Sequence, residues 1–164
     1  MMPLEGIRVL DLSRILAGPH AAQSLSDLGA DVIKVEAPWG DDSRTWGPPF
    51  QQGFDGGEVA SYFLSCNRGK KIVFANLKNE RERVRSLMDT VDVVIENFKP
   101  GAFDRLLGPV KPDLIVCSIS GYGQEGPRRD EPAFDLTMQA RSGIMSVTGE
   151  EDGPPAKVGV AWID

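Results

Sequence analysis

A single aspartate, Asp164, follows the mostly apolar segment Lys157–Ile163. A carboxylate beside apolar side chains is costly to keep charged unless something solvates it, so this group could serve as a nucleophile or as an acid–base group. It could instead be a helix N-cap or an uninvolved last residue. The rest of the chain decides between these interpretations.

Basic and polar side chains supply a second kind of chemistry. The basic stretch Asn67–Lys71 could bind phosphate, although a solvated loop is the plainer interpretation. Three further polar segments end or follow apolar runs: Asp11–Arg14, Glu96–Phe98 and Ser118–Gly121. What these groups can do depends on the elements that position them.

Short runs rich in valine and isoleucine alternate with helical segments. Apolar residues at consecutive positions predict strands buried on both faces at Ile7–Leu12, Asp31–Glu36, Lys71–Asn76, Asp92–Glu96 and Leu114–Ile119. Helices are predicted at Pro19–Leu28, Asn79–Asp89, Ala102–Leu107 and Asp135–Ser146. The alternation predicts an α/β fold, a Rossmann-like open parallel sheet with helices on both faces. Ligands bind such sheets beyond the carboxyl ends of the strands, where the three polar segments would lie.

Two segments depart from this alternation. Ala37–Gly57 is rich in glycine and holds three prolines and two tryptophans, which predicts an ordered loop of functional importance. Lys157–Asp164 is predicted to be a strand whose following helix is absent. We therefore expect a truncated large domain that stops partway through its fold.

Composition excludes several classes of protein. At 164 residues one domain is the default. The formal charge of −6 argues against a nucleic-acid partner, because there is no global basic field, but it permits a small polyanionic ligand. Cys66 and Cys117 form no metal-ligand spacing and no disulfide framework, so no metal is expected. No apolar run approaches the roughly 20 residues that span a bilayer, and the N-terminus lacks a secretory signal. We expect a cytoplasmic protein with no membrane association.

The common motifs of nucleotide and hydrolytic enzymes are absent from the sequence. The turn after the first predicted strand, Ser13–Pro19, has one glycine rather than G-x-G-x-x-G, and neither a P-loop nor H-E-x-x-H occurs. There is no G-x-S-x-G, and a single histidine, His20, makes a Ser/His/Asp triad implausible.

Seven blocks of the sequence together point to one family. They are Pro3–Arg14, Ala17–Pro19, Leu28–Glu36, Gly40–Phe50, Asn67–Lys71, Glu96–Gly101 and Ser118–Pro127. In this order and spacing the chain resembles the N-terminal part of a class III CoA-transferase. That family includes formyl-CoA, carnitine-CoA and succinyl-CoA:acceptor transferases, and also α-methylacyl-CoA racemases.

The resemblance implies that Asp164 is the nucleophile. Its carboxylate would attack an acyl-CoA thioester, giving a mixed anhydride and free CoA thiolate. The thiolate would then form an aspartyl-CoA thioester, and a carboxylic acid acceptor would take the CoA through a second anhydride. Such intermediates need shielding from water, which the apolar approach to Asp164 suits.

The resemblance also maps CoA contacts onto this chain. They fall on the turn Arg14, Ile15, Leu16 and Ala17, on Arg68, Lys70 and Lys71, on Asn97 and Phe98, and on Arg105. CoA and acyl-CoA would be substrates, so no permanently bound cofactor is expected. Gly121, Tyr122, Gly123 and Gln124 would line the pantetheine or acyl pocket, although a plain tight turn is the alternative.

The family resemblance carries three further expectations. Residues 1–164 would be the N-terminal portion of the large domain, without the small second domain and the C-terminal return. Since family members form interlocked homodimers, we expect an incomplete, weakly active or inactive fragment. The Gly40–Phe50 block resembles members acting on dicarboxylates such as succinate.

Two alternatives remain open at this point. In racemases a histidine precedes the aspartate of the segment after the glycine turn, but Phe134 precedes Asp135 here, and a phenyl ring carries no proton. A racemase is therefore disfavoured. The other alternative is a non-catalytic α/β domain that binds a nucleotide or a partner protein, with Asp11 and Asp164 structural.

Overall fold

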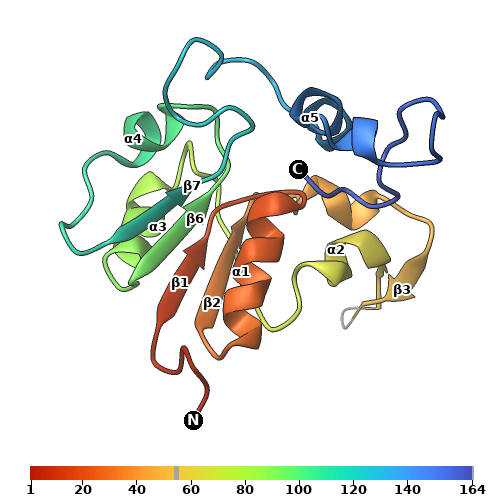
Figure 1. Cartoon of the computed structure of the whole chain (residues 1–164). Helices are drawn as coiled ribbons and strands as arrows, with labels where there is room; N and C mark the ends of the chain where they lie inside the picture. The colour runs from red at the N-terminus through yellow and green to blue at the C-terminus, as the bar shows by residue number, and fades with distance from the viewer. Residues whose placement is uncertain (54–55, 164) are drawn as a thin grey trace. The chain divides into compact units, whose positions relative to one another are not determined.

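The computed structural model describes residues 1–53 and 56–163 (Figure 1). The chain divides into two compact units, Met1–Ile119 and Ser120–Asp164. The sheet lies in the first unit. In the second unit, the described residues form the α-helix α5 (Asp135–Ser142) and the 3-10 helix η2 (Ile144–Val147).

The first unit is built on a five-stranded sheet with the strand order β5-β2-β1-β6-β7, all parallel. The strands are β1 (Arg8–Asp11), β2 (Asp31–Glu36), β5 (Lys71–Phe74), β6 (Val93–Glu96) and β7 (Ile115–Ser118). In chain order the sheet thus runs third, second, first, fourth, fifth, which is the order of doubly wound nucleotide-binding folds. The predicted Rossmann-like class is confirmed.

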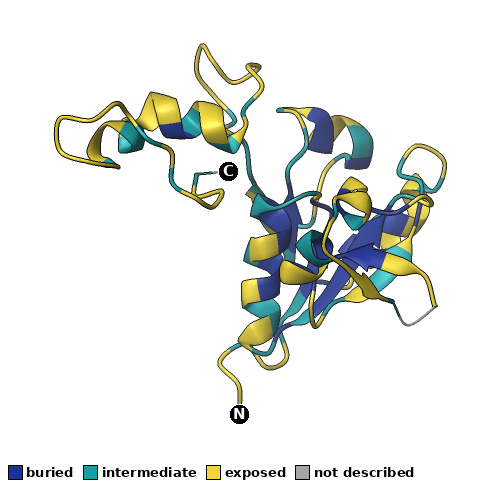
Figure 2. Cartoon of the chain, turned by 90° about the vertical axis from the view of Figure 1, so that its right-hand side faces the viewer, coloured by how far each residue is buried: buried dark blue, intermediate teal, exposed yellow. Residues whose placement is uncertain are grey.

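Helices cover both faces of the sheet, as predicted. Alternate residues of β1 point to opposite faces, so Val9 packs with Ala22 of α1 (Ala17–Asp27), whereas Leu10 belongs to the cluster on the other face. That second cluster includes Val84 of α3 (Arg81–Met88) and Phe103 of α4 (Ala102–Leu107). Figure 2 shows the central strands as the most deeply buried part of this unit.

The two outer strands differ from the prediction of burial on both faces. Phe74 of β5 is 51% exposed and Ile115 of β7 is 63% exposed. The reason is their position, since β5 and β7 are the edge strands of the sheet and each pairs on one side only within the described chain. The apolar runs were sufficient to predict strands but not to predict which strands lie at the edges.

The predicted loop Ala37–Gly57 is ordered in its described part and contains secondary structure of its own. The 3-10 helix η1 (Asp42–Thr45) is followed by β3 (Phe50–Gln52), which pairs antiparallel with β4 (Glu58–Ala60). The short helix α2 (Ser61–Ser65) then leads to Cys66 and the basic stretch. The hairpin was not predicted, because each of its strands has three residues, too few for a periodic signal.

The second unit corrects two predictions. The helix expected at Asp135–Ser146 is split at Gly143, which adopts φ +83° and ends α5. The strand expected at Lys157–Asp164 is not formed over residues 157–163, and residue 164 lies outside the described residues. Apolar sequence alone did not create a strand, because no neighbouring strand pairs with this segment in the described chain.

No helix among the described residues is long and apolar enough to cross a membrane.

Candidate functional site

The carboxyl edge of the sheet has a switch point between β1 and β6. These strands are neighbours, yet the chain leaves β1 toward β2 on one side and leaves β6 toward β7 on the other. In open α/β sheets this divergence creates a crevice in which ligands bind. The segments that flank it are the turn after β1 and the residues after β6, both of which sequence analysis placed in the site.

One side chain joins the two segments across this switch point. Asn97 accepts a hydrogen bond from Arg14 N at 3.0 Å through Oδ1 and donates one to Arg14 O at 2.8 Å through Nδ2. The backbone of Arg14 is thereby held on both sides by one amide. The Arg14 guanidinium remains 58% exposed beside Asp42, at 3.6 Å. An exposed pair of this kind contributes little stability, so the arginine is available to an anionic ligand.

The next residue, Ile15, has an unusual backbone conformation. Its φ is +73°, which is rare for a β-branched residue and costs about 1–3 kcal/mol. Its N–H donates to Asp41 Oδ2 at 3.3 Å, and its carbonyl accepts from Cys66 Sγ at 3.5 Å. Gly18 allows the following helix α1 to begin close to the turn, since a Cβ there would lie 2.2 Å from the Ser13 Cβ. Strain held in place this way is typical of ligand-binding turns.

A buried cluster of four charged groups lies behind this turn. Lys34 Nζ is 3.2 Å from Asp41 Oδ2 and 3.9 Å from Asp11 Oδ2, and Lys70 Nζ is 2.8 Å from the same Asp11 oxygen. The side chains of Asp11, Lys34 and Lys70 are 0% exposed, as is that of Asp41. Two cations and two anions compensate one another, which a buried cluster requires.

Further hydrogen bonds complete the buried charge cluster. The carboxylate of Asp11 accepts from the Ser13 N–H at 3.0 Å and from the Ser13 hydroxyl, while Lys34 Nζ donates to Ser13 O at 2.8 Å. Burial alone would raise the pKa of Asp41, but the Ser43 hydroxyl and the Lys34 ammonium hold it below its usual range. The turn is therefore supported from below by charges that solvent does not reach.

A bidentate ion pair orders the loop beside the turn. Arg44 Nε donates to Glu36 Oε2 at 2.6 Å and Arg44 Nη2 to Glu36 Oε1 at 2.8 Å. The guanidinium also lies over the Phe63 ring, 3.8 Å from its centroid. Glu36 Oε2 accepts from Asp41 N at 2.9 Å as well, so this pair helps to fix the residue that receives Ile15 N–H.

The structure separates the members of the predicted basic site. Lys70 donates to Asp11, to Pro19 O at 2.7 Å and to Asn67 Oδ1 at 2.9 Å, so all three of its N–H groups are used inside the protein. Burial lowers the pKa of Lys70 against the opposing effect of Asp11. Lys70 supports the turn and presents no free donor to a phosphate.

Arg68 and Lys71 differ from Lys70 because both are exposed. Arg68 pairs with Asp27, and Lys71 pairs with Asp31, each at 2.6 Å. Asp27 ends α1 and Asp31 begins β2, so these pairs lie toward the amino edge of the sheet. The structure therefore does not bring Arg68 and Lys71 together with Arg14.

Two further predicted contacts of the first unit lie after β6. Phe98 is half-buried against the core cluster, and its N–H donates to Glu96 Oε2 at 2.7 Å. Arg105, in the last turn of α4, is exposed and has no ion pair among the described residues. Leu16 and Ala17 cap and begin α1.

The glycine turn Gly121–Gln124 lies in the second unit. A Cβ at Gly121 would lie 2.0 Å from the Ala133 Cβ, so only glycine fits there. The Tyr122 hydroxyl is buried and has no hydrogen-bond partner among the described residues, and Arg141 lies 5.6 Å from the centroid of its ring. Gln124 Nε2 donates to Ser120 Oγ at 3.3 Å. A buried hydroxyl without a partner is a candidate ligand contact.

The two residues before Asp164 are both bound by one carboxylate, that of Asp135. Asp135 Oδ1 accepts from Trp162 N at 2.7 Å and from Ile163 N at 2.8 Å. Its other oxygen accepts from Gln139 Nε2 at 2.6 Å. Asp164, the predicted nucleophile, lies outside the described residues.

The carboxylate of Asp135 gives a pH-dependent contribution to stability. Burial alone would raise its pKa, but hydrogen bonds from Ile163 N, Gln139 and Trp162 N, with the charge of Lys157, hold it below its usual range. A lowered folded-state pKa stabilises the fold above the unfolded value of about 3.9, and this contribution disappears as the pH falls through the folded value. We expect the Trp162 and Ile163 amide resonances to titrate below about pH 3.9 and to lose this titration in D135N. A midpoint at or above the unfolded value would contradict this assignment.

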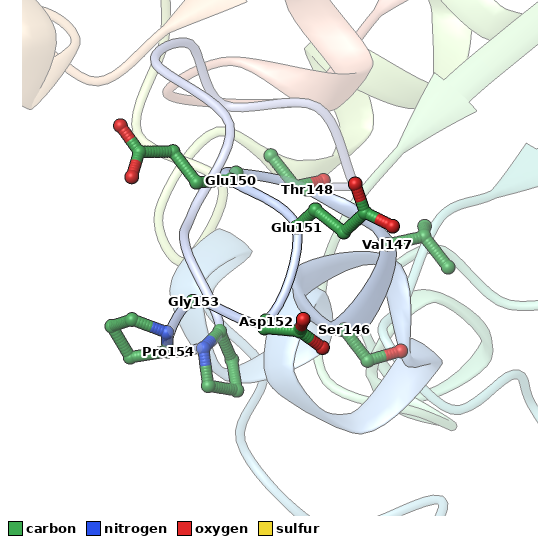
Figure 3. A pocket seen from close by; sticks show the side chains of 10 residues that line it. Ser146, Val147, Thr148, Glu150, Glu151, Asp152, Gly153 and Pro154 are labelled. Carbon is green, nitrogen blue, oxygen red and sulfur yellow. The ribbon is translucent and has the colours of Figure 1, made fainter.

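A shallow pocket within the second unit is distinct from the predicted site. It is lined by residues 146–155, including the carboxylates of Glu150, Glu151 and Asp152 (Figure 3). These charges would repel a phosphorylated ligand. The pocket contains none of the predicted site residues. Residues 1–53 and 56–163 also hold no group of three or more His, Cys, Asp or Glu side chains able to bind a metal ion.

Sequence analysis missed Lys34, Asp41 and the pair Asp135–Gln139. A signal existed for Lys34, because a lysine inside the buried run Asp31–Glu36 requires a carboxylate partner. For Asp41 the local signal was its N-cap position two residues before Ser43, whose N–H it accepts. For Asp135 there was none, since it accepts backbone N–H groups 27 and 28 residues away.

This chain is similar to one known family over almost its whole length. The family model described as CoA-transferase family III matches residues 4–164. The succinate–glutarate CoA-transferase of Agrobacterium fabrum is 51% identical over 172 residues, covering 99% of this chain and 43% of that protein. The human succinyl-CoA:glutarate CoA-transferase is 44% identical over 171 residues, covering 99% and 38%.

Solved structures agree with the sequence relatives. A CAIB/BAIF family protein from Brucella suis superposes with a TM-score of 0.92 at 50% identity, covering 98% of this chain and 44% of that one. Rv3272 from Mycobacterium tuberculosis gives a TM-score of 0.83 at 40% identity, covering 98% and 46%. The chain thus spans about two-fifths of the length of the curated relatives it matches.

Proposed function

Because this chain belongs to CoA-transferase family III, we propose that it acts in the transfer of CoA from an acyl-CoA to a carboxylic acid. The observation that carries the proposal is the construction of the switch point, where an exposed arginine, a strained turn and the start of α1 meet. Such an arrangement suits the phosphates of CoA, because a helix N-terminus and a guanidinium both attract anions.

The chemistry is proposed to run through Asp164. A carboxylate oxygen of Asp164 attacks the thioester carbonyl, the C–S bond breaks, and CoA leaves as a thiolate while an acyl–aspartyl anhydride forms. The thiolate attacks the aspartyl carbonyl and expels the donor acid as a carboxylate. An acceptor carboxylate then expels the thiolate in forming a second anhydride. The thiolate attacks the acceptor carbonyl, which frees Asp164 and yields the new acyl-CoA.

The remaining contacts are proposed in two groups. The turn after β1 binds CoA through Arg14, Ile15, Leu16 and Ala17. Across the switch point the contacts are Asn97 and Phe98, with Arg105 nearby in sequence. Further candidate phosphate contacts are Arg68 and Lys71. Lys70 acts indirectly, because its ammonium is bonded inside the protein. Gly121, Tyr122, Gly123 and Gln124 line the acyl or pantetheine pocket, where the unpartnered Tyr122 hydroxyl supports a ligand contact.

The acceptor is proposed to be a short dicarboxylate. The relatives from A. fabrum and human are named for succinate or succinyl-CoA and glutarate, and the Gly40–Phe50 block points the same way. A homodimer and a cytoplasmic location stay predictions. Phe134, in the place where racemases have histidine, offers no acid–base group, so proton transfer at an α-carbon is not proposed.

The role of the switch point is tested by Asn97→Ala. The variant loses both hydrogen bonds to the backbone of Arg14, so the turn relaxes and the KM for succinyl-CoA should rise about tenfold, with a smaller change in kcat. Steady-state kinetics on the complete gene product measures this split. Asn79→Ala, at an exposed position before α3, is the matched control and should leave both constants unchanged. A KM equal to that of the control would place CoA elsewhere.

A further inference from the structure

Two side chains of α5 replace the neighbouring strand that the segment Val158–Ile163 lacks. Asp135 accepts hydrogen bonds from Trp162 N and Ile163 N. Gln139, four residues later on the same helix, accepts from Val158 N at 2.8 Å and donates to Val160 O at 3.3 Å. Four backbone polar groups of this segment are thus satisfied by these side chains rather than by a sheet.

The side chains of Asp135 and Gln139 are also hydrogen-bonded to each other. Gln139 is completely buried, and its Nε2 donates to Asp135 Oδ2 at 2.6 Å. Asp135 Oδ1 receives the two backbone amides, so both of its oxygens are engaged. Since the i, i+4 spacing places the pair on one face of α5, the carboxylate has a fixed orientation toward the segment.

Asp135 holds the main chain of Trp162 and Ile163, the two residues that precede Asp164 in the sequence. We propose that Asp135 is a positioning residue for Asp164, and that Gln139 keeps the Asp135 carboxylate oriented for this task. The inference rests on the proposed function, in which Asp164 is the nucleophile.

The role assigned to Asp135 is that of a hydrogen-bond acceptor. In this role it acts through the main chain of Trp162 and Ile163. A displacement of the nucleophile by about 1 Å can lower a reaction rate by about 100-fold while leaving substrate binding intact. Loss of Asp135 should therefore slow formation of the aspartyl-CoA adduct more than it weakens the binding of succinyl-CoA.

Three variants of the complete gene product test the proposal. D135A removes every hydrogen bond of the carboxylate and should slow adduct formation about 10- to 100-fold, with a KM within about threefold of wild type. D135N places an amide N–H₂ against Gln139 Nε2 and should be intermediate. In D135N/Q139E the donor and acceptor exchange places and Val158 N keeps an acceptor, but Val160 O loses the donor that Gln139 supplies. The rate should therefore exceed that of D135N without reaching wild type.

The matched control is Glu80→Ala. Glu80 also accepts a backbone N–H next to a helix, from Asn76 at 2.8 Å, but it lies in the first unit. Its loss should affect stability alone. Rates are compared at a temperature where all variants are folded, and hydrogen exchange at Trp162 and Ile163 reports on the anchored segment independently of catalysis.

The outcomes separate the inference from the proposed function. If D164N forms the adduct, the proposed function fails whatever Asp135 does. If D164N forms none while D135A forms it as fast as Glu80→Ala, the positioning role is overturned. The structure predicts faster exchange at Trp162 and Ile163 and slow adduct formation in D135A, and a rate for D135N/Q139E above that of D135N.

Discussion

Replacement of Lys34 by methionine is expected to lower the free energy of unfolding by about 3–5 kcal/mol. Lys34 Nζ lies 3.2 Å from Asp41 Oδ2, and both side chains are 0% exposed. Methionine fills much of the same volume but leaves the Asp41 carboxylate buried without its cation, and it leaves Ser13 O without the Lys34 donor. Urea denaturation followed by circular dichroism measures the loss.

Two further variants test whether the cost of K34M comes from leaving the Asp41 carboxylate buried without a cation. Lys71→Met removes an exposed ion pair with Asp31 and should cost less than about 1 kcal/mol. The double variant K34M/D41N removes the uncompensated anion and should be more stable than the sum of the two single changes predicts. A cost for K34M as small as that of K71M would show that the cluster of Asp11, Lys34, Asp41 and Lys70 is not the buried support described for the turn.

Asn in place of Asp164 is expected to reduce kcat by about 10⁴- to 10⁶-fold, because the nucleophile is removed. The KM for succinyl-CoA should change little, since the proposed contacts to CoA do not include residue 164. Asp152→Asn is the matched control, an exposed aspartate of the same unit at φ +61°, which asparagine also adopts readily. Equal rates for the two variants would remove Asp164 from the mechanism.

The sheet could be predicted because its signal is local. Consecutive apolar residues in β1, β2 and β6 reflect burial on both faces, and the glycine and polar residues after them mark the turns. The strand alternation predicted that ligands bind at the carboxyl edge of the sheet, whereas the strand order that places the switch point between β1 and β6 came from the structure. Which strands lie at the edges could not be predicted, since β5 and β7 carry apolar runs of the same kind and differ only in their neighbours.

The sequence predicted several residues that lie at the candidate site, but not the contacts between residues that are far apart in the sequence. Arg14 and Asn97 were both predicted at the carboxyl edge, but the two hydrogen bonds between them join residues 83 positions apart. Arg68, Lys70 and Lys71 are adjacent in sequence, yet the structure buries the Lys70 side chain and leaves the other two exposed. Charge clustered in sequence did not mean charge clustered in space.

The segment before Asp164 shows the same limit. Valine, tryptophan and isoleucine predicted a strand, but a strand needs a partner, and within the described chain the partner is a pair of side chains on α5. No local sequence pattern indicates that a carboxylate such as Asp135 will accept hydrogen bonds from two backbone amides 27 and 28 residues away. Apolar composition indicated burial of the segment, but Val160 is 63% and Trp162 68% exposed, and long-range polar contacts determine its conformation.

The most direct test of CoA transfer through Asp164 is to trap the intermediate. The complete gene product is incubated with succinyl-CoA, treated with hydroxylamine or borohydride, digested and analysed by peptide mass spectrometry. The mechanism predicts an aspartyl hydroxamate or a reduced aspartyl side chain at residue 164, formed only when succinyl-CoA is present and absent from the Asn variant. Modification at another carboxylate, or turnover without any modification of residue 164, would contradict it.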